Sequence, residues 1–351
     1  MSLTARVAAP AAGGGAVTAP VPVVFVGLGP IGRDVARVVA ARPGYRCVGA
    51  VDVDPALAGL GLHDVLEVET NGEVTVCADL ADVDRPEQPA IAVHCAESSL
   101  RRAARSLHEL IAAGYHVVST CEELAAPWHT QPDVAAALDR EARANGVVLV
   151  GTGANPGYAM DYLPIVLAAS QRSLHRVSVH RVQDAGLRRL PLQHRIGTGL
   201  SRASFADLVA AGMISRVGLA ESVRMLDHAL ALRCSSFVDR IEPIVAAAPV
   251  TIPERTIPAG HVLGIEQEAV GLRGTTEVIR LRLELAVGLP DPRDEIVLDG
   301  EPGLRNVVRG LHGDHTTAAV VANSLARVLL VEPGLRTVDE LPASPLHFGQ
   351  A

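Results

Sequence analysis

The chain has 351 residues, of which 48% are hydrophobic and only 3% aromatic, and its formal net charge is −8 at pH 7. This length is typical of two domains, here with cores built mainly from Ala, Val and Leu. The acidic balance argues against nucleic acid or an anionic membrane as a partner, and no run of 18 apolar residues predicts a membrane span. All 31 side chains counted as Lys or Arg are arginines, which excludes Schiff-base chemistry and a lysine general acid.

Residues 1–20 are rich in Ala, Gly and Pro and lack the compact apolar stretch of a signal peptide. We expect them to form a flexible arm, and we expect the protein to be cytoplasmic. The five cysteines are widely spaced, without a Cys-x-x-Cys pair. This spacing favours buried thiols over zinc ligands or a disulfide, so small molecules remain as the expected partners.

A buried strand over 23–26 runs through a glycine-rich turn directly into a helix. Gly27 would let the chain turn tightly, Gly29 would let the backbone approach a pyrophosphate, and Gly32 would let helix and strand pack closely. The helix N-terminus would then face the phosphates with free N–H groups and a partial positive charge. We therefore expect a dinucleotide to bind at the turn, which consists of Gly27, Leu28, Gly29, Pro30, Ile31 and Gly32.

A second apolar strand, over 47–51, ends at Asp52, which lies 20 residues beyond Gly32. An acidic side chain at this distance is expected to receive the ribose hydroxyls of the dinucleotide. Asp52 favours NAD, because a 2′-phosphate would meet its negative charge. Arg33 and Arg46 are close enough in sequence to leave NADP open as the alternative.

The alternation of strands and helices continues to residue 150 and predicts a doubly wound α/β sheet, that is, a Rossmann dinucleotide-binding domain over 21–155. Ser98-Ser99 is expected to cap a helix that begins at Leu100. Ligands of such sheets lie beyond the carboxyl ends of the strands. We therefore expect His94 to contact the cofactor. The expected strands span 74–76, 91–94, 116–119 and 147–150.

The pattern changes after about residue 172, where apolar residues over 279–287 alternate with charged ones. Such a period of two is typical of a strand that is covered on one face. It predicts a substrate-binding and dimerisation domain over 156–341, of α+β type, built on a mixed or antiparallel sheet. Further strands are expected near 177–179 and 262–265, with helices near 205–213 and 219–232. A final helix over 316–330 is compatible with packing on either domain.

Two glutamates, Glu122 and Glu123, follow the strand over 116–119 and so lie at the expected crevice. A carboxylate there could take a proton from an amine or water and would attract a cationic iminium. Alternatively, both lie in the solvated first turn of a helix, where the helix dipole favours acids. The sequence does not say which of the two is catalytic.

Three other polar groups are candidates for the substrate pocket. Asn155, followed by Pro156, fits the start of a helix, and its place at the domain junction also predicts contact with nicotinamide or substrate, together with Tyr158. His194 lies in a glycine-rich loop and is either a pocket wall or a surface histidine.

The cluster over 312–315 is better explained by a helix cap from Asp314 than by a metal, so we expect no metal site.

These residues together resemble the dihydrodipicolinate-reductase-like oxidoreductases, and most closely the branch of 2,4-diaminopentanoate dehydrogenase and the native amine dehydrogenases. The resemblance implies an NAD(P)-binding domain, a second domain that dimerises through its sheet, and an active-site glutamate in the Cys-Glu-Glu loop. It also implies reversible deamination of an amine to a ketone or aldehyde and ammonia. Dihydrodipicolinate reductases use a lysine that this chain lacks, which favours the amine branch. The segments that carry the resemblance are Val26–Gly32, Ser119–Leu124, Gly151–Asp161 and His312–His315, with Asn323.

The leading hypothesis is an NAD(P)-dependent amine dehydrogenase, acting as a homodimer, in which Glu122 deprotonates ammonium or a carbinolamine and stabilises the iminium charge. One rival is a carbonyl, semialdehyde or hydroxy-compound dehydrogenase on the same scaffold, with His194 as proton donor. Another is a catalytically silent protein that senses a dinucleotide.

Overall fold

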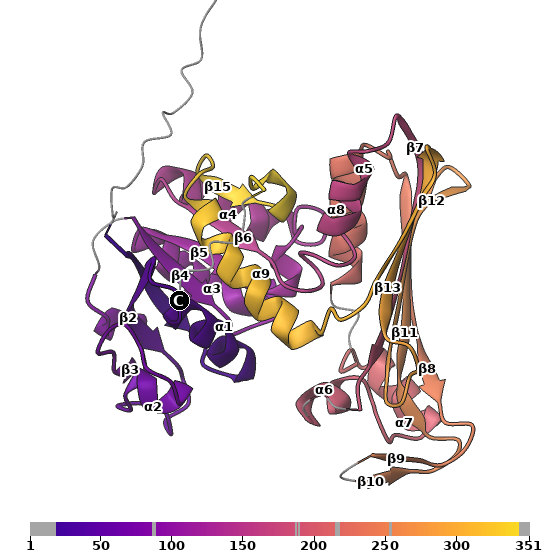
Figure 1. Ribbon diagram of the computed structural model, residues 1–351, viewed down its shortest axis with the longest axis horizontal. Coiled ribbons are helices and arrows are strands. Elements are labelled where there is room, and N and C mark those ends of the chain that lie inside the picture. The colour runs from indigo at the N-terminus through magenta and orange to yellow at the C-terminus, as the bar shows by residue number, and fades with distance from the viewer. Residues whose placement is uncertain are drawn as a thin grey trace, which may run out of the picture.

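The structure is a computed structural model that describes residues 19–85, 89–186, 188, 190–214, 218–252 and 255–343. Most of the expected flexible arm, residues 1–18, lies outside the described residues. Within them the chain builds two large sheets with helices between them, and a small third sheet of two strands (Figure 1).

In the described part of the chain, the first sheet has seven parallel strands in the order β15-β6-β5-β4-β1-β2-β3. The apolar strand cores are buried on both sides, as expected for a parallel sheet covered by helices. This confirms the predicted Rossmann-like fold. The strands are β1 (Val21–Val26), β2 (Tyr45–Val51), β3 (Val76–Cys77), β4 (Ala90–His94), β5 (Tyr115–Ser119), β6 (Val148–Gly151) and β15 (Gly334–Arg336).

Each face of this sheet has its own apolar core. One core is formed with α1 (Pro30–Ala40) and α9 (Gly313–Val328), and the other with α3 (Leu100–Ala112) and α4 (Pro132–Ala144). The final helix thus packs on the first domain, where Val321 and Leu325 are fully buried (Figure 1). The chain therefore returns to the first sheet after building the second.

The second sheet is mixed, with the order β14-β13-β7-β12-β11-β8. Strands β7 and β12 are parallel, and the other neighbours are antiparallel. This settles the predicted choice between a mixed and an antiparallel sheet. The strands are β7 (Ser173–Asp184), β8 (Ser236–Val245), β11 (Val262–Arg273), β12 (Thr276–Ala286), β13 (Arg293–Glu301) and β14 (Leu304–Val308).

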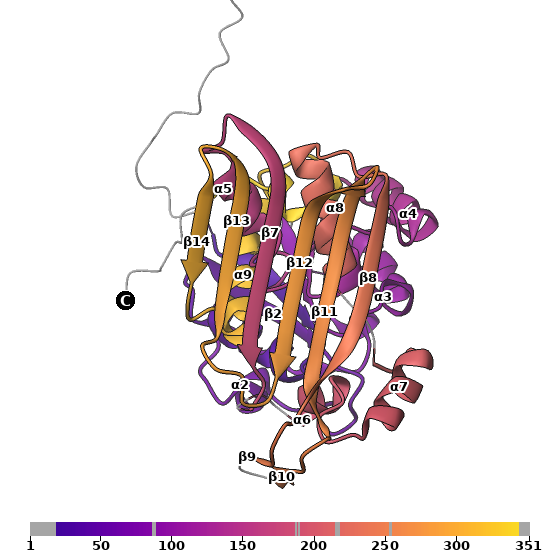
Figure 2. The same ribbon diagram turned by 90° about the vertical axis from the view of Figure 1, so that its right-hand side faces the viewer.

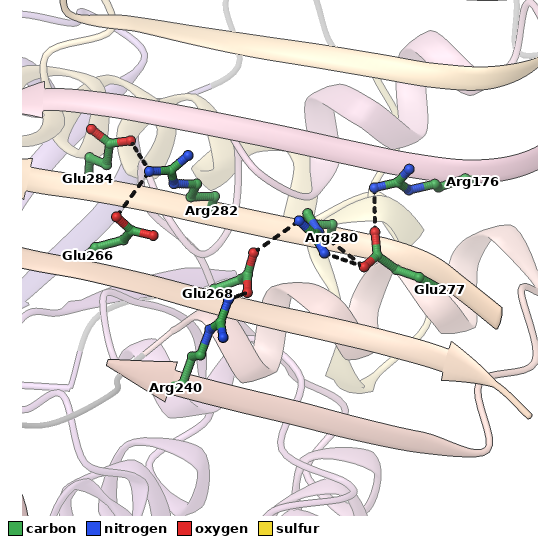
Figure 3. Close-up of polar contacts among 8 residues, drawn as sticks. All are labelled: Arg176, Arg240, Glu266, Glu268, Glu277, Arg280, Arg282 and Glu284. Carbon is green, nitrogen blue, oxygen red and sulfur yellow. Dashed lines mark hydrogen bonds and ion pairs between the residues drawn. The ribbon is translucent and has the colours of Figure 1, made fainter. Parts of the chain in front are cut away.

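One face of the second sheet packs on α5 (Tyr162–Ala168) and α8 (Leu219–Leu230), and no described element covers the other face (Figure 2). The predicted alternation on β12 explains this difference, because Ile279 and Leu281 are fully buried while Arg280 points to the uncovered face. That face carries a network of ion pairs across neighbouring strands (Figure 3).

One predicted helix start and one predicted cap need correction. The helix expected at Pro156 begins instead at Tyr162, where the Asp161 carboxylate accepts the Tyr162 N–H. Ser99 is the N-cap of α3 but makes no side-chain cap bond. The remaining elements are α2 (Leu62–Leu66), η1 (Leu80–Asp82), η2 (Glu122–Leu124), α6 (Leu190–Arg195), α7 (Arg202–Ala210), β9 (Val250–Ile252), β10 (Arg255–Ile257) and η3 (Val338–Glu340).

Candidate active site

The glycine turn between β1 and α1 has the shape that a dinucleotide pyrophosphate requires. Gly27 has φ +89°, a conformation that favours glycine, and a Cβ there would lie 2.7 Å from the Ala96 nitrogen. A Cβ on Gly32 would clash with the Gly27 carbonyl oxygen, so helix and strand could not pack as they do. A Cβ on Gly29 would meet no atom within 4 Å, so the backbone there faces open space. The tight turn at Gly27 and the close packing at Gly32 agree with the sequence analysis, and the approach of a pyrophosphate to Gly29 stays a prediction.

Asp52 follows β2 directly and holds the glycine turn. One carboxylate oxygen accepts the Leu28 N–H at 2.5 Å, and the other accepts the Asp54 N–H at 2.8 Å. The Arg33 side chain donates to the Leu28 carbonyl at 2.7 Å, so this arginine also lies against the turn. Each carboxylate oxygen keeps a lone pair that could accept a ribose hydroxyl.

A cleft of about 330 Å³ lies between the carboxyl ends of the first sheet and the second sheet. The first domain contributes Gly29, Pro30 and Ile31, and the inner face of the second sheet contributes polar side chains of β7 and β11. Among the described residues that line it, the ionisable side chains are Cys95, Glu97, Glu122, Arg181, Arg188, Arg195 and Asp314. The lining therefore offers carboxylates and arginines, with open space at the glycine turn for a cofactor.

The two glutamates of the Cys-Glu-Glu loop have different roles. Glu122 lines the cleft, its side chain is 27% exposed, and it accepts a hydrogen bond from Arg195 of α6 at 2.8 Å. Glu123 turns away, and its carboxylate accepts the Leu100 N–H at 2.7 Å and the Gln131 side-chain N–H at 2.5 Å. Glu123 is thus the cap of α3 that sequence reasoning assigned to Ser98-Ser99. Glu122, and not Glu123, thus lines the cleft.

Asn155 lines the cleft at the junction between the two domains. Its Oδ1 is buried and accepts no hydrogen bond from the described residues, which is costly for a carbonyl oxygen unless a partner arrives. A donor such as a carboxamide or an amine would satisfy it. This location agrees with the contact to nicotinamide or substrate that its place in the sequence predicts.

Three other predicted site residues do not line the cleft. His94 is fully buried, its ring nitrogens lie 2.9 and 3.0 Å from the hydroxyls of Ser119 and Ser106, and burial lowers its pKa to about 4. The expected cofactor contact of His94 therefore needs correction, because its side chain is a neutral part of the core. Tyr158 and His194 also lie outside the lining, and His194 is exposed on α6.

Two ion pairs on the second-domain side, one buried and one half-buried, could not be paired from the sequence. Arg181 of β7, only 3% exposed, pairs with Asp294 and donates to the Leu311 carbonyl. Arg188 donates two hydrogen bonds to Asp314, at 2.7 and 3.2 Å. Asp314 thus binds an arginine in the cleft, whereas the sequence predicted a helix cap. The two partners of each pair lie more than 100 residues apart in the chain, so no local motif predicts the pairing.

A glycine turn at the strand ends of a Rossmann-like sheet, with a cleft toward a second sheet, is the architecture of two-domain proteins of the dinucleotide-binding class. Within that class the chain belongs to the family of 2,4-diaminopentanoate dehydrogenase C-terminal domains, whose sequence model matches residues 158–350. This confirms the resemblance inferred from the motifs.

Relatives with similar sequence and structure agree with this assignment. The 2,4-diaminopentanoate dehydrogenase of Acetoanaerobium sticklandii is 26% identical, over 94% of this chain and 95% of its own length. The amine dehydrogenase of Mycobacterium smegmatis has a similar structure, with a TM-score of 0.82, 24% identity, and coverage of 93% of this chain and 97% of its own. GenD2 from gentamicin A biosynthesis, solved in complex with NAD, matches with a TM-score of 0.52 and 17% identity over 94% and 93% of the two chains.

Proposed function

We propose that this protein is an NAD(P)-dependent amine dehydrogenase that converts a small amine and water reversibly to a ketone or aldehyde and ammonia. The observation that carries the proposal is the Glu122 carboxylate, which lies in the cleft that also contains Gly29, in a chain without lysine. The family of the chain and the activities named for its relatives support it.

The residues of the first domain fit a dinucleotide. The glycine turn leaves space at Gly29, the N-terminus of α1 presents free N–H groups, and Asp52 would receive the ribose hydroxyls. When bound, NAD(P) supplies the chemistry of hydride transfer to or from the carbon that bears nitrogen. Arg33 lies against the turn and keeps NADP open, so the ratio of kcat/KM for the two cofactors decides the preference.

Glu122 moves protons in this scheme. In the direction of amine oxidation, it takes a proton from the substrate ammonium group and passes it on to solvent. The carboxylate, negative again, then stabilises the iminium formed when the carbon loses hydride. Water adds to the iminium carbon, and the carbinolamine loses ammonia to leave the carbonyl. In reverse, Glu122 deprotonates ammonium so that ammonia can attack. Arg195 keeps the carboxylate at the cleft until a cationic substrate competes for it.

The test compares two isosteric variants of neighbouring residues. Glu122→Gln is expected to lower kcat for reductive amination by about 10²- to 10⁴-fold, the usual contribution of a general base, while the protein stays folded. Glu123→Gln is the matched control, because the Glu123 side chain caps α3 outside the cleft. Full activity of Glu122→Gln would reject the proposed role.

Assays without ammonium separate the proposal from its rivals. Carbonyl reduction that proceeds equally well without ammonium would indicate a carbonyl or hydroxy-compound dehydrogenase. His194, the proton donor of that rival, does not line the cleft in this structure. Binding of NAD(H) or NADP(H) without turnover of any amine or carbonyl would indicate a dinucleotide sensor.

We further propose that the protein is a homodimer formed by the uncovered face of the second sheet. This face carries acidic side chains on β11 and arginines on β12, so two copies related by a twofold axis could pair opposite charges (Figure 3). Light scattering should give twice the chain mass of 36.6 kDa. The double reversal Arg280→Glu with Arg282→Glu should yield monomers, whereas Arg105→Glu, on α3, should not. A wild-type monomer at assay concentration would reject this interface.

A further inference from the structure

A second cavity, also of about 330 Å³, lies outside the cleft and shares none of its lining residues. It is formed by the segment that follows η2, by α4 and α8, and by the chain around β15. We propose that this cavity binds a small organic anion with a planar apolar part. The lining residues used in the argument are Trp128, Arg143, Arg224, Met225, Leu335 and Arg336.

The lining of the cavity includes three arginines and two carboxylates. Arg143 pairs with Asp139 at 2.8 Å, and Arg336 pairs with Glu340 at 3.1 Å, so each of these two arginines has a carboxylate partner four residues away. Arg224 makes no ion pair within the described ranges, and Glu221, one turn earlier on α8, interacts with its charge only from outside the lining. A local excess of positive charge on a chain of net charge −8 marks a place where an anion is attracted.

The Arg224 side chain is held in place while one of its hydrogen-bond donors has no acceptor. Its guanidinium carbon lies 4.6 Å from the centre of the Phe237 ring, which holds it by a cation–π contact. Its Nε is buried and has no hydrogen-bond acceptor among the described residues. A carboxylate or phosphate that reached this guanidinium would provide the charge and the acceptor that the described residues do not.

The rest of the wall is apolar and partly aromatic. Trp128 is 39% exposed, an unusual position for so large an apolar surface, and Met225 and Leu335 are almost fully buried beside it. A planar group could stack on the indole while its charged end points to Arg224. The volume lies at the lower end of ordinary ligand sites, which limits the ligand to a small molecule.

The cavity and the cleft are connected by one short segment. Trp128 lies six residues after Glu122, and the side chain of Gln131 in the same segment holds the Glu123 carboxylate at 2.5 Å. A ligand that fixes Trp128 therefore acts on the loop that presents Glu122 to the cleft. We expect the anion to change turnover without competing with the amine.

The chain contains a single tryptophan, so its intrinsic fluorescence reports on this cavity directly. Benzoate is the probe, benzyl alcohol has the same ring without the charge, and inorganic phosphate has the charge without the ring. Benzoate should change the Trp128 fluorescence saturably and bind more tightly than either control. Arg224→Gln should weaken benzoate binding by about tenfold or more, the usual loss for a charge-assisted hydrogen bond.

Two further variants keep the test decisive. Arg224→Lys should recover part of the affinity, and Arg105→Gln, in neither cavity, should leave it unchanged. Thermal melts show whether each variant is folded, and calorimetry measures binding independently of fluorescence. The proposal is overturned by equal affinity for benzyl alcohol, by undiminished binding to folded Arg224→Gln, by benzoate inhibition competitive with the amine, or by no binding up to the solubility limit of benzoate.

Discussion

Glu221 provides a quantitative test of the packing between the domains. It lies in the first turn of α8, is only 4% exposed, and accepts the Gly218 N–H at 3.2 Å. Burial raises its pKa from an ordinary value of 4.5 to about 7, and the nearby charge of Glu123 acts in the same direction. Backbone hydrogen bonds and the positive charge of Arg224 oppose the rise without cancelling it.

The sign of the effect on stability follows from proton binding. Between about pH 4.5 and pH 7 the folded protein binds the Glu221 proton more tightly than the unfolded chain does, so the free energy of unfolding falls as pH rises. A difference of roughly 2.5 pKa units corresponds to about 3 kcal/mol, and this penalty is fully present above pH 7. Glu221→Gln remains neutral and keeps an oxygen for the Gly218 N–H. The free energy of unfolding of Glu221→Gln, relative to that of the wild type, should therefore rise by about 3 kcal/mol from about pH 4.5 to about pH 8.

Urea denaturation of the wild type and Glu221→Gln at these two pH values measures the difference, with equal m-values as the check that the same transition is compared. Using a difference between two pH values removes any constant effect of the substitution on packing. The exposed Glu332, replaced by Gln, is the matched control and should show no such trend. If Glu221→Gln changes the free energy of unfolding equally at both pH values, the burial argument is wrong.

The glycine turn gives a second prediction, in which Gly29→Ala should fold normally and raise the KM for the cofactor by about tenfold or more, because its methyl group enters only the open space. Gly32→Ala should instead lower Tm or prevent folding, because the methyl group meets the Gly27 carbonyl. Equal cofactor KM values for the wild type and Gly29→Ala would refute the pyrophosphate assignment. A third prediction concerns Glu123→Ala, which removes the acceptor of the Leu100 N–H and should cost about 1 kcal/mol of stability, the usual value of a helix cap. If Glu123→Ala instead left Tm unchanged and lowered kcat as much as the loss of a general base would, then Glu123 would be the base and Glu122 would not.

Local sequence patterns were sufficient for most of the fold. The Rossmann-like sheet follows from apolar strands and glycine spacing, and the second sheet follows from the alternation on β12, where Leu281 and Leu283 face inward and Arg280 and Arg282 outward. The packing partner of the final helix could not be read in this way. Its apolar residues are covered by α1, some 280 residues earlier in the chain, and by the strands β5 and β6, contacts that periodicity does not encode.

The site was predictable only to the level of a segment. Two adjacent carboxylates at a strand end were recognised from sequence, but which one faces the cleft depends on the tight turn of η2 and on the α3 N-terminus that Glu123 caps. His94 ends a buried strand at the expected edge, yet its side chain points between Ser119 and Ser106 and not into the cleft. The position of a residue in its strand predicts the sheet edge at which the residue lies. The direction of its side chain depends on the hydrogen-bond partners around it, which the local sequence does not reveal.

The absence of lysine shapes the chemistry that this cleft can perform. Arginines carry its positive charge, and an arginine keeps its proton near neutrality, so they can hold anions but cannot exchange protons. Of the other ionisable side chains in the described lining, burial raises the pKa of Cys95 to about 12, and Asp314 is held by two hydrogen bonds from Arg188. Glu97 accepts a hydrogen bond from Arg102 in the first turn of α3. In the function proposed above, proton exchange with nitrogen is the role of Glu122, whose arginine partner Arg195 comes from α6 and is itself 39% exposed.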